Sequence, residues 1–169
     1  VTVAADTLPA ASNAYDSNFG ASVAISPENL IAVGIPNSAQ DGSVAIYKPN
    51  GDKTSFSITD VLTASPNGIK YGESIAFDKS VSGDGNQFLA IGSPNRDAGS
   101  TGNAGGVWMA YGNPTEGVDS FQKVELQTSD SDFVGAGAFS SPGAQIGSSV
   151  AIHEGVIVAG GPYWSGHPF

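Results

Sequence analysis

Apolar and small polar residues follow one shared pattern in three short segments of the chain. Each segment begins with an apolar residue and a glycine, continues with any residue and a serine, and ends with an apolar–alanine–apolar triplet. Alternation of this kind, entered through a glycine, predicts a half-buried β-strand. The three segments are FGASVAI at 19–25, YGESIAF at 71–77 and IGSSVAI at 146–152.

A second shared segment follows each of these. It holds four consecutive apolar or alanine residues and ends in Gly-x-Pro. The apolar run predicts a strand that is buried on both faces. The strand is expected to stop at the proline, because proline has no N–H to donate. Short connections at 26–29 and 153–155 predict antiparallel hairpins in the first and third copies. The segments are LIAVGIP at 30–36, FLAIGSP at 88–94 and VIVAGGP at 156–162.

Two of the three copies continue with a third and a fourth strand. The third strand begins with a glycine and the fourth alternates apolar and polar residues. In the first copy Asn50-Gly51 separates them, a pair that favours a type I′ hairpin turn. The predicted third strands are 42–47 and 106–111, and the predicted fourth strands are 56–58 and 124–126.

The repeats predict an all-β chain of tandem four-stranded antiparallel blades, as in a β-propeller. A closed propeller needs about 4–8 blades, so we expect a partial propeller that is completed by further blades of the same or another chain. Val1-Thr2-Val3 matches the fourth-strand pattern. The expected organisation is a lone fourth strand with its lead-in at 1–18, blades at 19–64 and 71–130, and the first two strands of a further blade at 145–164.

These units resemble FG-GAP repeats, the blades of the integrin α-subunit head and of many secreted proteins. The resemblance implies a propeller fold and a role in adhesion or recognition, and the short loops look like the calcium-poor variety of the repeat. It rests on Phe19-Gly20 with 33–36, on Tyr71-Gly72 with 91–94, on Ile146-Gly147 with 159–162, and on Tyr47 and Tyr111, which close the third strands.

Calcium is the one cofactor that the resemblance brings into question. Integrin-type blades carry an Asp-rich loop between their first two strands, and only segment 78–86 is long enough here to hold one. Asp78, Asp84 and Asn86 are its candidate oxygen ligands. Serines replace the other carboxylates, and Lys79 adds a charge that opposes a cation. A solvated hairpin loop is the alternative that these residues favour.

Composition excludes several classes of partner and chemistry. The net charge is −10, from 16 acidic and 6 basic residues, so we expect no nucleic-acid partner, because phosphate binding needs a basic surface. No apolar run approaches the roughly 20 residues that cross a bilayer, so no membrane insertion is expected. Cysteine is absent, which excludes thiol catalysis, disulfides and cysteine-based zinc sites.

Other chemistry-bearing residues favour structural roles. Ser22, Ser74 and Ser149 recur at the same place in every copy, so we expect each hydroxyl to bond nearby backbone and not to act as a nucleophile. His153 and His167 lack neighbouring ligands at metal spacing. Trp108 is expected to be a buried blade aromatic, with a sugar-stacking surface as the alternative. We therefore expect no catalytic residues and no enzyme activity.

The expected function is that of a non-catalytic extracellular or cell-surface module for adhesion, recognition or protein–protein interaction. One alternative is a structural subunit of an extracellular filament or coat, a homo-oligomer assembled through open blade edges. A second alternative is the non-catalytic part of a larger secreted hydrolase. Each of these follows from resemblance and fold, and none from a recognised site.

Overall fold

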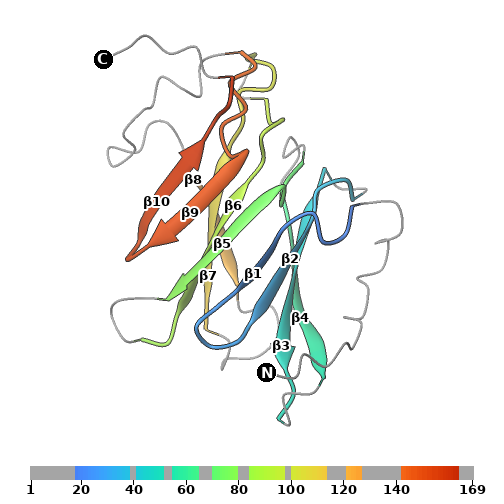
Figure 1. Cartoon of the computed structure of the whole chain (residues 1–169), viewed down its shortest axis with the longest axis vertical. Helices are drawn as coiled ribbons and strands as arrows, with labels where there is room; N and C mark the ends of the chain where they lie inside the picture. Colours follow the sequence, from blue (N-terminus) through green and yellow to red (C-terminus); the bar gives the residue numbers. More distant parts are fainter. Residues whose placement is uncertain are drawn as a thin grey trace.

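The fold consists of antiparallel β-strands, which confirms the all-β prediction. Within the described residues there are ten strands and no helix (Figure 1). The lone fourth strand predicted at Val1–Val3 lies outside these residues, as do the ends of the predicted ranges at 130 and 164. The computed structural model describes residues 18–38, 41–51, 55–64, 70–79, 84–97, 100–113, 121–126 and 142–163.

The strands form two four-stranded sheets and one two-stranded sheet, which we call the first, second and third units in chain order. Each four-stranded sheet pairs its strands in sequence order, as hairpin-connected strands do. The first unit is β1 (Val23–Ile25), β2 (Ile31–Ile35), β3 (Ser43–Pro49) and β4 (Phe56–Thr63). The second is β5 (Ser74–Lys79), β6 (Gln87–Gly92), β7 (Val107–Gly112) and β8 (Gln122–Leu126), and the third is β9 (Ser149–His153) and β10 (Val156–Gly160).

Equivalent residues pair in the same register in all three units. The apolar residue after the repeated serine lies opposite the residue before the glycine of the second strand. Because side chains alternate between sheet faces, this shared register places equivalent residues on the same face of every unit. The pairs are Val23 with Val33, Ile75 with Ile91, and Val150 with Ala159.

The units pack face against face along the chain. The first strand of the second unit, β5, contacts β1 on one side and β9 on the other (Figure 1). The main core lies between the first two units and includes Leu30, Val44, Leu89 and Ile91. A smaller cluster around Val107 and Ile146 joins the second unit to the third, where Val150 and Ile157 pack against it. The second unit thus packs one of its faces against the first unit and the other against the third.

The connection between β3 and β4 differs from the predicted type I′ turn. Such a turn needs positive φ at both central residues, whereas neither Asn50 nor Gly51 has a positive φ. Strand β3 ends at Pro49 and β4 begins only at Phe56. Asn50 closes this longer loop instead, because its backbone N–H donates to Ser55 O at 2.9 Å and its amide donates to Ser55 Oγ at 2.7 Å.

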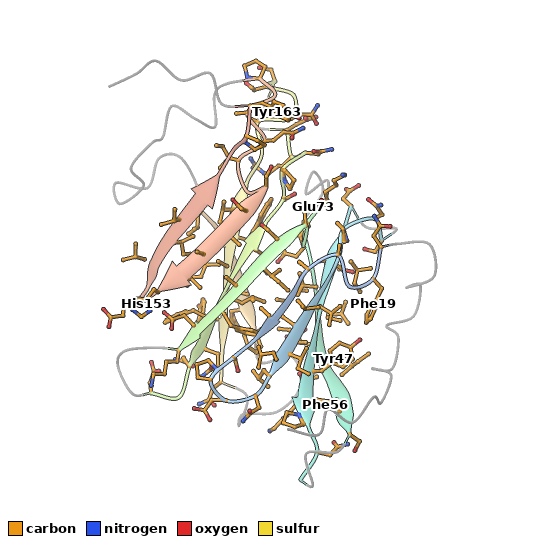
Figure 2. The ribbon with its side chains drawn as sticks, in the orientation of Figure 1. Phe19, Tyr47, Phe56, Glu73, His153 and Tyr163 are labelled. Carbon is orange, nitrogen blue, oxygen red and sulfur yellow. The ribbon has the colours of Figure 1, made fainter. Side chains whose placement is uncertain are left out.

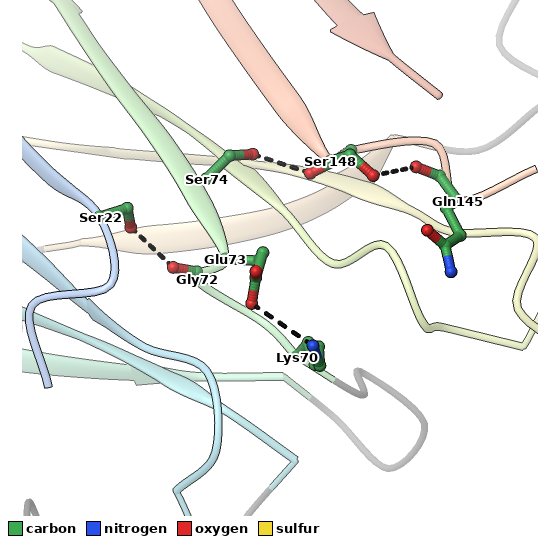
Figure 3. A network of polar contacts seen from close by, with 8 residues as sticks. Ser22, Lys70, Gly72, Glu73, Ser74, Gln145 and Ser148 are labelled. Atoms are coloured by element: carbon green, nitrogen blue, oxygen red, sulfur yellow. Dashed lines mark hydrogen bonds and ion pairs between the residues drawn. The ribbon is translucent and has the colours of Figure 1, made fainter. Parts of the chain in front are cut away.

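The repeated serines join one unit to the next. Ser22 Oγ donates to the carbonyl of Gly72 at 2.7 Å, and Ser74 Oγ donates to the carbonyl of Gly147 at 2.8 Å (Figure 3). The expectation of a bond to nearby backbone was wrong, because these acceptors lie 50 and 73 residues away. By contrast, Ser148 Oγ bonds within its own turn, to the carbonyl of Gln145 at 2.8 Å.

Candidate functional site

The two ends of the described stack display apolar sheet faces. We call Val23 and Ile25 of β1 the leading face; their exposed fractions are 66% and 69%. The strand pairing places a second set of residues on one side of β9 and β10, where Val156 and Val158 are 65% and 64% exposed. We call this second set, Ser149, Ala151, His153, Val156 and Val158, the trailing face.

In the first unit, the residues equivalent to Val156 and Val158 of the trailing face are buried, as is the equivalent of Val158 in the second unit. Ala32 and Ala90 occupy the position of Val158, and both are fully buried. Leu30 occupies the position of Val156 and is also buried, within the core between the first and second units. The strand pattern is therefore the same, and the difference in exposure comes from the second unit, which packs over Leu30 and Ala32.

The residues of the leading face are likewise exposed, whereas their equivalents in the second unit are packed. In the second unit, Ile75 and Phe77 are the equivalents of Val23 and Ile25. Both pack against the main core between the first and second units. Other residues on the same side of the first unit, including Val33 and Tyr47, are buried in a cluster of their own. The exposed part of this face is therefore the edge strand β1.

The trailing face is shallowly hollowed at the end of its hairpin. The hollow has a volume of about 380 Å³. His153 lies at the tip of the hairpin (Figure 2), where Glu154 and Gly155 adopt positive φ values of 50° and 79° to make the tight turn. The hollow is lined by Ala151, Ile152, His153, Glu154, Val156 and Val158. Its walls suit aliphatic side chains, with one imidazole and one carboxylate at the rim.

The predicted calcium ligands lie on the hairpin between β5 and β6. Asp84 accepts two hydrogen bonds from Asn86, one from its backbone N–H and one from its side-chain amide, both at 2.9 Å. Asp78 Oδ1 accepts a bond from the backbone N–H of Lys79 at 2.8 Å, while Asp78 Oδ2 is buried and has no hydrogen-bond partner in the described structure. Residues 80–83 of this segment lie outside the described residues, so calcium binding stays a prediction.

We expect calcium to raise the melting temperature of the chain by less than about 1 °C relative to its value in EDTA. The calcium concentration is about 1 mM, the range in which extracellular modules bind this ion. The reason for the small rise is that both oxygens of Asp84 already accept hydrogen bonds from Asn86, which compete with a cation for the same carboxylate. The measurement is a thermal melt of the chain in each buffer. A larger, saturable rise that Asp84→Asn removes would establish the calcium site instead.

The structure places the other sequence candidates as follows. Trp108 is buried, with its ring edge-to-face with Tyr71 at a centroid distance of 5.3 Å, and the guanidinium of Arg96 lies 5.6 Å from its centroid. It therefore supports the core, as expected, and is not a sugar-stacking surface. His153 lies at the end of β9 and is exposed. His167 lies outside the described residues.

In the sequence, Val156 and Val158 are recognisable only as strand residues. Within the repeat, Val158 stands where the other two copies have alanine, and Val156 continues an apolar row. A larger apolar side chain at a position that neighbouring units fill with alanine is the signal that could have identified this face. The pattern did not show that Val156 and Val158 are exposed in the described structure.

No family model matches the chain, and no curated protein matches it. Among the described residues, no three His, Cys, Asp or Glu side chains lie close enough to hold a metal ion together. The same part of the chain has no helix that is long and apolar enough to span a membrane.

Proposed function

We propose that this chain is a non-catalytic module for adhesion, recognition or protein–protein interaction, extracellular or at the cell surface, built of FG-GAP-like propeller blades. The pair of apolar end faces carries the proposal. Six large hydrophobic side chains are exposed in the described residues, and four of them, Val23, Ile25, Val156 and Val158, belong to these faces. Clustered exposed apolar residues mark interaction surfaces more often than scattered ones do.

The chemistry of the faces favours a protein partner. In each face the backbone N–H and C=O groups point along the sheet, so the surface itself presents aliphatic side chains. Burying them releases roughly 25 cal/mol per Å² of apolar area. The net charge of −10 disfavours nucleic acids and anionic membranes by repulsion. An apolar protein surface with few acidic groups is the complementary partner.

Site-specific photo-crosslinking tests the proposal. The chain carries a benzophenone amino acid in place of Val158, or in place of the exposed Ser57 of β4 as the matched control, and is illuminated on the surface of the cells that produce it. We expect a discrete adduct with another protein from position 158 and none from position 57. Equal labelling at both positions, or no adduct from position 158, would contradict a specific recognition surface.

The structural-subunit alternative is favoured by one observation on β10. Strands β2 and β6 each pair with a neighbour on both sides, whereas β10 pairs only with β9 within the described residues. An unpaired strand edge is a template for another strand. In the same crosslinking experiment, an adduct of twice the chain's mass would favour this subunit function over recognition of a different protein.

A further inference from the structure

We propose that the Asn50-Gly51 pair is a site of covalent modification, at which Asn50 is converted to aspartate or isoaspartate, and that two serine hydroxyls across the loop restrain the reaction. The inference goes beyond the proposed function and does not rest on it, because it concerns the loop between β3 and β4 and neither end face. The residues that carry it are Asn50, Gly51, Ser55 and Ser57.

The reaction is an attack by one backbone nitrogen on the side chain that precedes it. The nitrogen of Gly51 forms a bond to Cγ of Asn50 and gives up its proton, while the bond between Cγ and Nδ2 breaks and ammonia leaves. Water then opens the resulting succinimide ring at either of its two carbonyls, which gives aspartate or isoaspartate. The net change is a gain of water and a loss of ammonia, with no oxidation or reduction.

Gly51 suits the role of nucleophile. The residue is exposed, so water and hydroxide reach its N–H. It has no side chain to shield the backbone, and a Cβ added there would meet no atom within 4 Å. Neighbouring groups therefore do not crowd the attacking residue.

The side-chain amide of Asn50 is held at both of its polar atoms. Nδ2 donates to Ser55 Oγ at 2.7 Å, and Oδ1 accepts a bond from Ser57 Oγ at 3.1 Å. We call these two groups, Ser55 Oγ and Ser57 Oγ, the hydroxyl pair. The backbone N–H of Asn50 also donates to Ser55 O at 2.9 Å. The amide is thus directed across the loop towards β4.

Ring closure requires the amide to leave the hydroxyl pair. Cγ of Asn50 must turn back along its own main chain to reach the nitrogen of Gly51, which needs rotation of the side chain into another rotamer. Both hydrogen bonds to the hydroxyl pair are lost in that rotation. Each bond is expected to slow the reaction roughly two- to tenfold.

The two products differ in how they fit this loop. A serine hydroxyl can rotate to donate as well as accept, so the hydroxyl pair can donate to the carboxylate of an aspartate at position 50. Isoaspartate instead carries the main chain through the side-chain carbons, which lengthens the backbone between β3 and β4. Either product adds one negative charge to a chain whose net charge is −10.

Peptide mapping by mass spectrometry, after incubation in mildly alkaline buffer, measures the conversion. It separates position 50 from the second Asn-Gly pair of the chain, at 67–68. We expect Asn50 to react more slowly in the folded wild type than in the same chain unfolded in guanidinium chloride. Gly51→Ala fits the open space and is expected to suppress the reaction in both states, because the added methyl group hinders the attack.

Substitution of the hydroxyl pair tests the restraint directly. Ser55→Ala and Ser57→Ala are each expected to speed the conversion of Asn50 roughly two- to tenfold in the folded chain and to leave the rate in the unfolded chain unchanged. Ser57→Thr keeps a hydroxyl and is expected to keep the slow rate. Thr59→Val is the matched control, because it removes the bond from Thr59 Oγ1 to Ile46 O at 3.3 Å, which lies on the same pair of strands. It is expected to leave the rate at position 50 unchanged.

Several results would overturn the proposal. Equal rates at Asn50 in the folded and unfolded wild type would exclude the restraint, as would alanine variants that react like the wild type. A slower reaction in Ser57→Ala would show that this hydroxyl activates the carbonyl instead. Acceleration by Thr59→Val equal to that by the serine variants would assign the effect to loosened strands. No conversion in the unfolded chain would exclude the site itself. None of these outcomes bears on recognition of a partner.

Discussion

Replacing Gly92 with alanine is expected to lower the free energy of unfolding by about 3 kcal/mol or more. A Cβ at Gly92 would overlap the carbonyl oxygen of Gly147 and the hydroxyl of Ser74. The carbonyl belongs to the backbone of the next unit and cannot move aside without opening the junction. For a chain of this size the loss corresponds to a fall in melting temperature of roughly 6–12 °C, which calorimetry or a thermal melt measures.

Gly160→Ala is the matched control for this prediction. Gly160 occupies the position of Gly92 in the third unit, but its added Cβ would meet only the side chain of Ser149. Because that hydroxyl lies at the end of a rotatable side chain, the expected loss is less than about 1 kcal/mol. Equal losses in the two variants would show that the junction carbonyl is not the cause.

Two substitutions at Tyr71 are expected to change stability in opposite directions. The ring is buried against Trp108, yet its hydroxyl is buried without a hydrogen-bond partner in the described structure. Tyr71→Phe keeps the ring and removes the unsatisfied group, so we expect a gain of about 1 kcal/mol. Tyr71→Ala removes the ring as well and is expected to cost about 3–5 kcal/mol. Urea unfolding at neutral pH measures both; a loss in Tyr71→Phe would contradict the unsatisfied hydroxyl.

The same residue predicts sensitivity to alkali. Burial, and secondarily the negative charge of Asp60, raise the pKa of Tyr71 above its ordinary value of 10.0. Above about pH 10 the unfolded chain ionises this tyrosine while the folded chain keeps it neutral, so stability is complete below that pH and falls as the pH rises.

The alkaline loss is measured by the difference between two chains. Unfolding is followed between about pH 8 and pH 11, and the wild type is expected to lose more stability than Tyr71→Phe. Burial also raises the pKa of Tyr47, but that residue is present in both chains and cancels in the difference. Parallel losses in the two chains would contradict the raised pKa of Tyr71.

The repeated pattern was sufficient to predict the local structure. Alternating apolar positions, the recurrent glycines and the terminating prolines located the hairpins and the strand order within each unit. The turn at Asn50 was the exception, because its side chain bonds Ser55 across a longer loop. A two-residue preference cannot show how far apart the flanking strands end.

Contacts between units were beyond the reach of the pattern. The repeated serines looked like local hydrogen-bond donors, but Ser22 and Ser74 bond the next unit. Asp60 lies in β4 of the first unit and Tyr71 precedes β5 of the second. Packing buries the phenol and also brings the charge of Asp60 near it, and both raise the pKa of Tyr71. Such pairs depend on how two sheets are placed, which no spacing within one segment records.

By itself, the sequence determined that the chain is acidic and free of cysteine. It also determined an all-β chain of repeated antiparallel strands, because strand formation depends on the alternation of apolar and polar residues and on glycine and proline at neighbouring positions. Only the tertiary structure decided which copies of the same motif are buried. Ala32 lies under the second unit and Val158 lies in the open, although both follow the same strand pattern. The physical reason is that burial of a sheet face requires a second surface, and that surface comes from a distant part of the chain or from another molecule.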